Sequence, residues 1–129
     1  MGIKGLRNAL SQNQVRQAHI SELAGKKVVC DGFAWLHKGA FGCAMQLALG
    51  QPTERYVEYC MHLARLLRHN TVTPIIVLDG ASLPSKARTS EERTARRREN
   101  LEKGKTLLQY GDTAQAERHF QAAVTVTGS

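Results

Sequence analysis

The sequence predicts an α/β fold built on a parallel sheet, and three observations support that prediction. Two apolar runs, residues 26–32 and 74–80, each end in Asp-Gly, which is typical of a strand stopped by a turn. Sequence with helical periodicity separates the two runs, and that favours parallel pairing. The chain has 129 residues, of which 42% are hydrophobic and 22% are charged. This suits one globular domain better than two domains or a disordered chain.

Apolar spacing and breaker residues place the first helices. Residues 3–10 predict a short helix, and residues 33–48 predict a longer, mostly buried one. The stretch 50–53 interrupts the pattern, Thr53 is the expected N-cap, and the next helix runs to about residue 70. The apolar residues that set these helices are Ile3, Leu6, Leu10, Trp35, Leu36, Ala40, Met45, Leu47, Tyr56, Cys60, Ala64 and Leu67.

The last third of the chain is predicted to be a pair of helices. A long polar helix spans about residues 86–110 after the cap Ser85, and Gly111-Asp112 ends it. A final helix covers residues 113–123, with Ala116, Phe120 and Ala123 on one face. Two strands are few for a sheet covered by helices on both faces. We therefore expect the sequence to be the first part of a longer protein.

Charge and apolar content narrow the classes of partner. Eighteen Lys and Arg against eleven Asp and Glu give a net charge of +7, which favours polyanions such as nucleic acid. No apolar run approaches the roughly 18–20 residues that a membrane span needs, so an integral membrane protein is excluded. An anionic membrane surface ranks second to nucleic acid, and we expect no membrane as a partner. The N-terminus lacks the apolar core of a signal peptide, and the three cysteines are expected to be free thiols in a reducing compartment.

Two of the three aspartates, Asp31 and Asp79, follow the predicted strands. Ligands collect at the carboxyl ends of strands in open α/β sheets, and parallel neighbours would bring these two carboxylates together. A shared cation would offset their repulsion, and hard carboxylate oxygens suit Mg²⁺ or Mn²⁺. The alternative is that each Asp-Gly is only a turn, although the helical periodicity after Gly32 disfavours a hairpin.

The long polar helix carries a second feature, a cationic stripe. Lys86 and Arg93 are seven residues apart, and Arg97 lies one turn further along the same side. Such a stripe would neutralise phosphates; alternatively the helix is simply solvated, with Glu92–Arg96 and Glu99–Lys103 pairs. A stripe beside paired carboxylates can hold a phosphodiester over metal ions, which is what phosphoryl transfer needs.

The sequence also resembles a known family, the flap endonuclease and XPG superfamily of 5′ structure-specific nucleases. It is most similar to the eukaryotic 5′→3′ exonuclease branch, the exonuclease-one type. The matching segments are Met1-Gly2-Ile3-Lys4-Gly5-Leu6, Val28-Val29-Cys30-Asp31-Gly32-Phe33-Ala34-Trp35-Leu36-His37-Lys38-Gly39, Gly50-Gln51-Pro52-Thr53-Glu54-Arg55-Tyr56-Val57-Glu58-Tyr59-Cys60, Pro74-Ile75-Ile76-Val77-Leu78-Asp79-Gly80, Leu83-Pro84-Ser85-Lys86 and Arg96-Arg97-Arg98-Glu99-Asn100-Leu101.

The resemblance implies a PIN-like nuclease N-terminal domain over residues 1–129. Residues 1–81 would form the strand–helix core, with a duplex-splitting wedge at about 41–55, and residues 82–123 would form a helical arch and its cap. It implies Mg²⁺-dependent, two-metal hydrolysis of DNA with 5′ ends, nicks, gaps or flaps, in nuclear DNA repair. The implied site residues are Asp31 and Asp79 as metal ligands, Lys86 and Arg93 as catalytic cations, and Gly2, His37, Lys38, Arg96 and Arg97 as DNA-binding residues.

The sequence departs from the family in what it does not contain. The family's further Glu and Asp ligands lie in an internal region downstream, followed by a helix-two-turn-helix DNA clamp, and both are absent here. Asp112 and Glu117 fall in the arch and cannot replace those ligands. Two carboxylates are too few for two Mg²⁺ ions, so we expect this chain alone to be inactive or nearly so.

The sequence is compatible with other functions. A DNA-binding fragment without catalysis and a protein-interaction fragment are both compatible with the sequence. The last two helices have the spacing of a tetratricopeptide pair, but one copy is present where arrays need about three. Cysteines and histidines offer zinc ligands, but none of them has the spacing of a zinc-binding pair.

Overall fold

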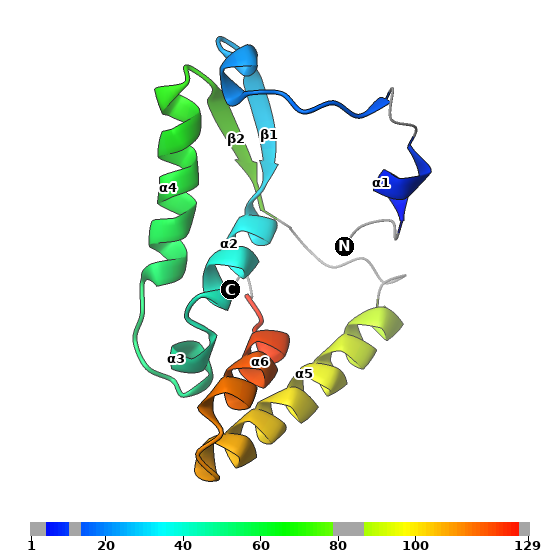
Figure 1. Ribbon diagram of the computed structural model, residues 1–129, viewed down its shortest axis with the longest axis vertical. Helices are drawn as coiled ribbons and strands as arrows, with labels where there is room; N and C mark the ends of the chain where they lie inside the picture. The colour runs from blue at the N-terminus through cyan, green and yellow to red at the C-terminus, as the bar shows by residue number, and fades with distance from the viewer. Residues whose placement is uncertain (1–4, 11–13, 79–86, 127–129) are drawn as a thin grey trace.

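The computed structural model describes residues 5–10, 14–78 and 87–126, with side chains from residue 91 onward in the last range. Figure 1 shows a small sheet flanked by helices, with a helix pair below it. The elements in chain order are α1 (Leu6–Ala9), the 3₁₀ helix η2 (Ile20–Leu23), β1 (Lys27–Asp31), α2 (Gly32–Phe41), α3 (Ala44–Ala48), α4 (Arg55–His69), β2 (Thr73–Val77), α5 (Ala87–Gln109) and α6 (Thr113–Ala123).

The two strands pair in parallel, which confirms the predicted fold class. Lys27 lies opposite Thr73, and Asp31 lies opposite Val77, so the register runs without a bulge over the whole of both strands. The connection between them passes through α2, α3 and α4, because a parallel pair needs a long crossover.

Only one face of this sheet is covered by the residues that the structure describes. Cys30 forms a buried cluster with Leu67 and Val72, onto which Trp35 packs. On the opposite face Val29 is 68% exposed and Ile75 is 42% exposed. The two apolar runs therefore form strands that are not buried on both faces. The physical reason is that α2 and α4 contribute to the same cluster, so they cover the side chains of one face only.

The predicted single helix over residues 33–48 is two helices. α2 ends at Phe41 and α3 begins at Ala44. The break lets Ala44, which is 1% exposed, join a second buried cluster with Ala116 and Phe120 of α6, a contact that a straight helix would not provide. The predicted N-cap of α4 is also corrected: Glu54 holds that position, and the Thr53 hydroxyl accepts a hydrogen bond from the Arg55 backbone N–H at 3.4 Å.

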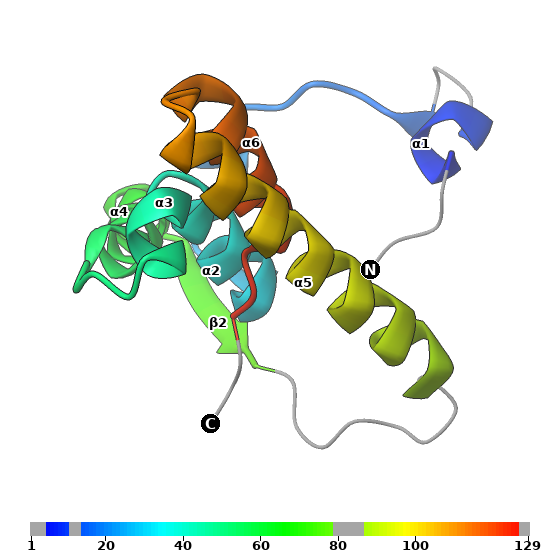
Figure 2. The ribbon, with the colours of Figure 1, turned by 90° about the horizontal axis from the view of Figure 1, so that it is seen from below.

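The pair formed by α5 and α6 has a close-packed seam. Asp112 caps α6 by accepting a hydrogen bond from the Gln115 backbone N–H at 3.1 Å, after a turn at Gly111 with φ of 81°. A Cβ at Gly104 would lie 2.6 Å from the Phe120 ring, so α5 approaches α6 as closely as a glycine allows. Figure 2 shows the first turns of α5 projecting beyond α6.

Two further findings concern the ends of the fold. α1 is shorter than predicted, and Leu6 and Leu10 of its apolar side are 49% and 41% exposed. Among the described helices, none combines the length and the apolar character needed to cross a bilayer.

Candidate nucleic-acid interface

The carboxyl end of β1 is the point from which the candidate site is built. Asp31 is the last residue of β1 and the N-cap of α2, and its Oδ1 accepts a hydrogen bond from the Ala34 backbone N–H at 3.0 Å. A Cβ at Gly32 would lie 2.6 Å from the Leu78 side chain and 2.8 Å from that of Ile76. The Asp-Gly pair is therefore a strand-to-helix junction packed against the β2 side of the sheet, and the alternative of a hairpin turn is wrong.

The predicted partners of Asp31 lie outside the described residues. Asp79 falls two positions after Val77, the residue opposite Asp31, and Asp79, Lys86 and Gly2 are all in ranges that the structure does not describe. The shared carboxylate site and the phosphate contact of Lys86 stay predictions.

His37 of α2 responds to the charges around this strand end. The ring is partly buried, and burial lowers its pKa below the ordinary value. The positive charge of Arg97 on α5 lowers it further, whereas the Asp31 carboxylate opposes the shift. The imidazole of His37 thus lies within range of two opposite charges, one at the end of β1 just before α2 and one on α5, far along the chain. Lys38, next to His37, is exposed.

The cations of α5 fall into two groups. Arg93, Arg96 and Arg98 are exposed, while Arg97 is partly buried and its Nη1 donates a hydrogen bond to Thr125 Oγ1 at 3.1 Å. The lysines nearer the end of α5 form ion pairs instead.

Two such pairs are present in this part of α5. Lys103 pairs with Glu99 at 2.6 Å, as expected under the alternative of a solvated helix, and Lys105 pairs with Glu102 at 3.3 Å. The arginines in the first half of α5 are therefore the better candidates for phosphate contacts.

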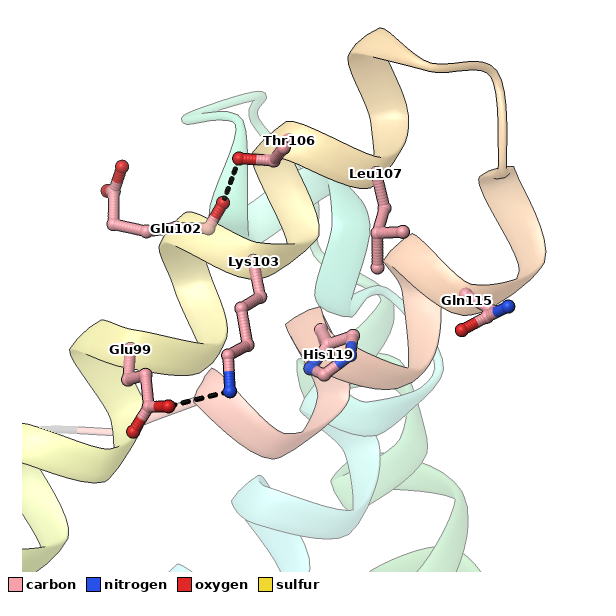
Figure 3. Close-up of a pocket in the computed structure, with 7 residues that line it drawn as sticks. All are labelled: Glu99, Glu102, Lys103, Thr106, Leu107, Gln115 and His119. Atoms are coloured by element: carbon pink, nitrogen blue, oxygen red, sulfur yellow. Dashed lines mark hydrogen bonds and ion pairs between the residues drawn. The ribbon is translucent and has the colours of Figure 1, made fainter.

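Two hollows beside α5 and α6 do not coincide with this site. A groove of about 530 Å³ is lined by residues of α5 and α6 that include the Glu99–Lys103 pair and His119 (Figure 3). An apolar cavity of about 290 Å³ lies between α3, α5 and α6. Neither contains Asp31 or His37. Within the described ranges no three Cys, His, Asp or Glu side chains gather as metal ligands would.

Two contacts could not be found from the sequence. Thr125 reaches Arg97 across 28 positions, and His119 Nδ1 lies 2.8 Å from Asn100 Oδ1 across the seam of α5 and α6. No local pattern links either pair, because each contact depends on the angle at which the two helices pack.

The family of this chain is shown by a match to a known domain. Residues 1–100 match the XPG N-terminal domain. The chain belongs to this family, which confirms the resemblance seen in the sequence.

Individual relatives agree with that assignment. Exonuclease 1 of Xenopus laevis is 44% identical over 129 residues, covering all of this chain and 17% of that protein. Exodeoxyribonuclease 1 of Schizosaccharomyces pombe is 43% identical over 127 residues, which are 98% of this chain and 22% of that protein. The DNA damage-inducible protein DIN7 of Saccharomyces cerevisiae is 34% identical, and the match covers 29% of it. The chain thus spans less than a third of each of these relatives.

Proposed function

We propose that this chain is the N-terminal part of a Mg²⁺-dependent 5′→3′ DNA exonuclease or 5′ flap endonuclease that acts in DNA repair in the nucleus. The family assignment and the names of the relatives support nuclease chemistry. The observation that carries the proposal is the exposed Asp31 carboxylate at the carboxyl end of a parallel strand. His37 of the next helix is affected by this carboxylate and by the Arg97 guanidinium of α5.

Asp31 fits the role of a metal ligand. Its Oδ1 accepts the Ala34 N–H, which orients the carboxylate and leaves Oδ2 for a hard cation such as Mg²⁺. A bound Mg²⁺ supplies a nucleophilic water and offsets charge on the phosphate. Asp79 is the second proposed ligand. Because two carboxylates are too few to hold two ions, we expect the isolated chain to be inactive or nearly so.

The cations and the imidazole have separate proposed roles. Lys86 and Arg93 contact the scissile phosphate, and Arg96, Arg97, Lys38 and the N-terminal Gly2 contact the DNA strand. His37 suits a different contact, since its lowered pKa keeps the ring neutral at pH 7. A neutral imidazole stacks on a base instead of pairing with a phosphate.

The test uses 5′-labelled duplexes that carry a nick, a recessed end or a flap, with Mg²⁺ present. We expect binding that weakens steeply with salt, because each phosphate contact contributes about −0.9 to the slope of log K against log salt. Arg93→Gln combined with Arg96→Gln should reduce the magnitude of that slope by roughly two. Arg118→Gln, an exposed charge on α6, is the matched control and should leave the slope unchanged.

Each outcome decides between the candidate functions. Cleavage by the wild-type chain would support the nuclease assignment and overturn the expected inactivity. Salt-dependent binding without cleavage supports the DNA-binding part of the proposal. No binding to any of the duplexes at low salt would contradict the DNA interface and favour a protein-interaction fragment.

A further inference from the structure

The geometry points to Thr125 as a positioning residue: its hydroxyl holds the Arg97 guanidinium in place for the DNA backbone. This inference rests on the proposed function of Arg97 and adds a residue outside the strand end and outside the matched domain, which ends at residue 100. Three features of the structure carry it: the anchoring of residue 125, the hydrogen bond itself and the place to which Arg97 is held.

The segment after α6 is anchored by packing. The Val124 backbone N–H donates a hydrogen bond to the Phe120 carbonyl oxygen at 3.0 Å, and Val124 packs on the cluster that contains Phe120 and Ala116. Thr125 lines the apolar cavity together with Leu101 of α5. The backbone just before Thr125 is thus anchored on the cluster that holds the fully buried Phe120 and Ala116, while Thr125 itself is exposed.

The hydrogen bond gives Arg97 a partner that no neighbour along α5 supplies. Arg97 Nη1 donates to Thr125 Oγ1 at 3.1 Å, and Arg97 is partly buried where Arg93, Arg96 and Arg98 are exposed. A long side chain loses rotamer freedom when it binds a ligand, and prior ordering reduces that cost. A guanidinium has five N–H donors, so one bond to a hydroxyl leaves donors for phosphate oxygens.

Arg97 is held near α2, the helix that follows β1. Its charge acts on His37 of α2, as does the charge of Asp31. In Figure 2 the segment that follows α6 runs between α2 and α5. The hydroxyl therefore holds the guanidinium close to the proposed DNA-binding residues.

The test compares Thr125→Val, which removes the hydroxyl at nearly constant shape, with Thr125→Ser, which keeps it. Thr106→Val is the matched control, because the Thr106 hydroxyl donates to the Glu102 carbonyl of its own helix (Figure 3). Arg97→Gln removes the positioned charge. Dissociation constants and salt slopes are measured on a 5′-recessed duplex, and the His37 pKa is measured by NMR in the free chain.

We expect Thr125→Val to weaken DNA binding about three-fold, in line with the loss of one hydrogen bond, and to leave the salt slope nearly unchanged. The pKa of His37 should rise toward its ordinary value, because Arg97 is released from its position. Thr125→Ser and Thr106→Val should resemble the wild type in both measurements. A role limited to stability would lower the melting temperature without moving this pKa.

The failures of the two proposals can be told apart. If Arg97→Gln changes neither affinity nor salt slope, the DNA-binding role of Arg97 is wrong and the inference falls with it. If Arg97→Gln weakens binding but Thr125→Val does not, the inference alone is overturned. Equal weakening by Thr125→Val and Thr125→Ser would also overturn it. Thr125→Ala gives a second test with the same expected result, should the valine variant fold poorly.

Discussion

The end of β1 and the seam between α5 and α6 differ in how accessible their polar side chains are to solvent. At the seam, Gly104 and Phe120 are in close contact, and polar groups such as Asn100 and His119 face each other. At the strand end, Asp31 and Lys38 are exposed. The seam therefore fixes the direction of α5, while the strand end keeps charged groups accessible to a ligand. Substitutions in the two regions should therefore affect different properties.

The largest effect is expected at Phe120. Its side chain is fully buried among α3, α5 and α6, so Phe120→Ala should lower the free energy of unfolding by about 3–5 kcal/mol. Val29→Ala on the exposed face of β1 should lower the free energy of unfolding far less. Urea unfolding followed by circular dichroism measures both, and similar losses for the two variants would contradict the comparison.

Gly104→Ala should lower the free energy of unfolding by a smaller amount, whereas the same change at an ordinary helix position would raise it. Alanine normally stabilises a helix by about 1 kcal/mol relative to glycine. Here the new methyl group would meet the Phe120 ring at 2.6 Å, and overpacking costs about 1–3 kcal/mol. The same unfolding measurement should therefore show net destabilisation. A more stable variant would show that the seam has room to relax.

Arg93→Gln should separate binding from stability. The side chain is exposed on the projecting half of α5, so we expect a change in stability within about 0.5 kcal/mol. The salt slope for DNA should fall in magnitude by about one. A large loss of stability with an unchanged salt slope would show that Arg93 supports the fold and does not contact DNA.

The smallest effect concerns the ion pair of Glu99 and Lys103. The hydrogen bond and the positive charge from Lys103 lower the pKa of Glu99 below its ordinary value. A carboxyl group whose pKa is lower in the folded state stabilises above its unfolded pKa, and this contribution is lost as the pH falls through the folded pKa. NMR titration should show the pKa of Glu99 returning to its ordinary value in Lys103→Met, and no return would mean that another group causes the shift.

The fold could be predicted where local pattern and tertiary packing agree. The parallel strands are the clearest case, and α6 spans the predicted residues 113–123. The break between α2 and α3 could not be predicted, because Ala44 turns toward α6, which lies about seventy positions later in the sequence. The bare face of the sheet was missed for a related reason: apolar content does not tell which side of a strand the crossover helices cover.

The candidate site could be predicted in residue type but not in geometry. Asp31 and the cationic helix stand out in the sequence because of where they fall relative to the strands. The electrostatic link between His37 and Arg97 and the bond from Arg97 to Thr125 depend on how α2, α5 and α6 pack. A hydroxyl in a run of valines and threonines carries no local signal of such a role.

Paramagnetic line broadening by Mn²⁺ decides whether the strand end or the helix pair is the metal-binding region. At low Mn²⁺ concentration, we expect the amide signals of Gly32 and Ala34, next to the Asp31 carboxylate, to broaden first in the wild-type chain. In Asp31→Asn that broadening should be lost. Broadening centred on Glu99 and Glu102 in the groove between α5 and α6, unchanged in Asp31→Asn, would contradict this expectation.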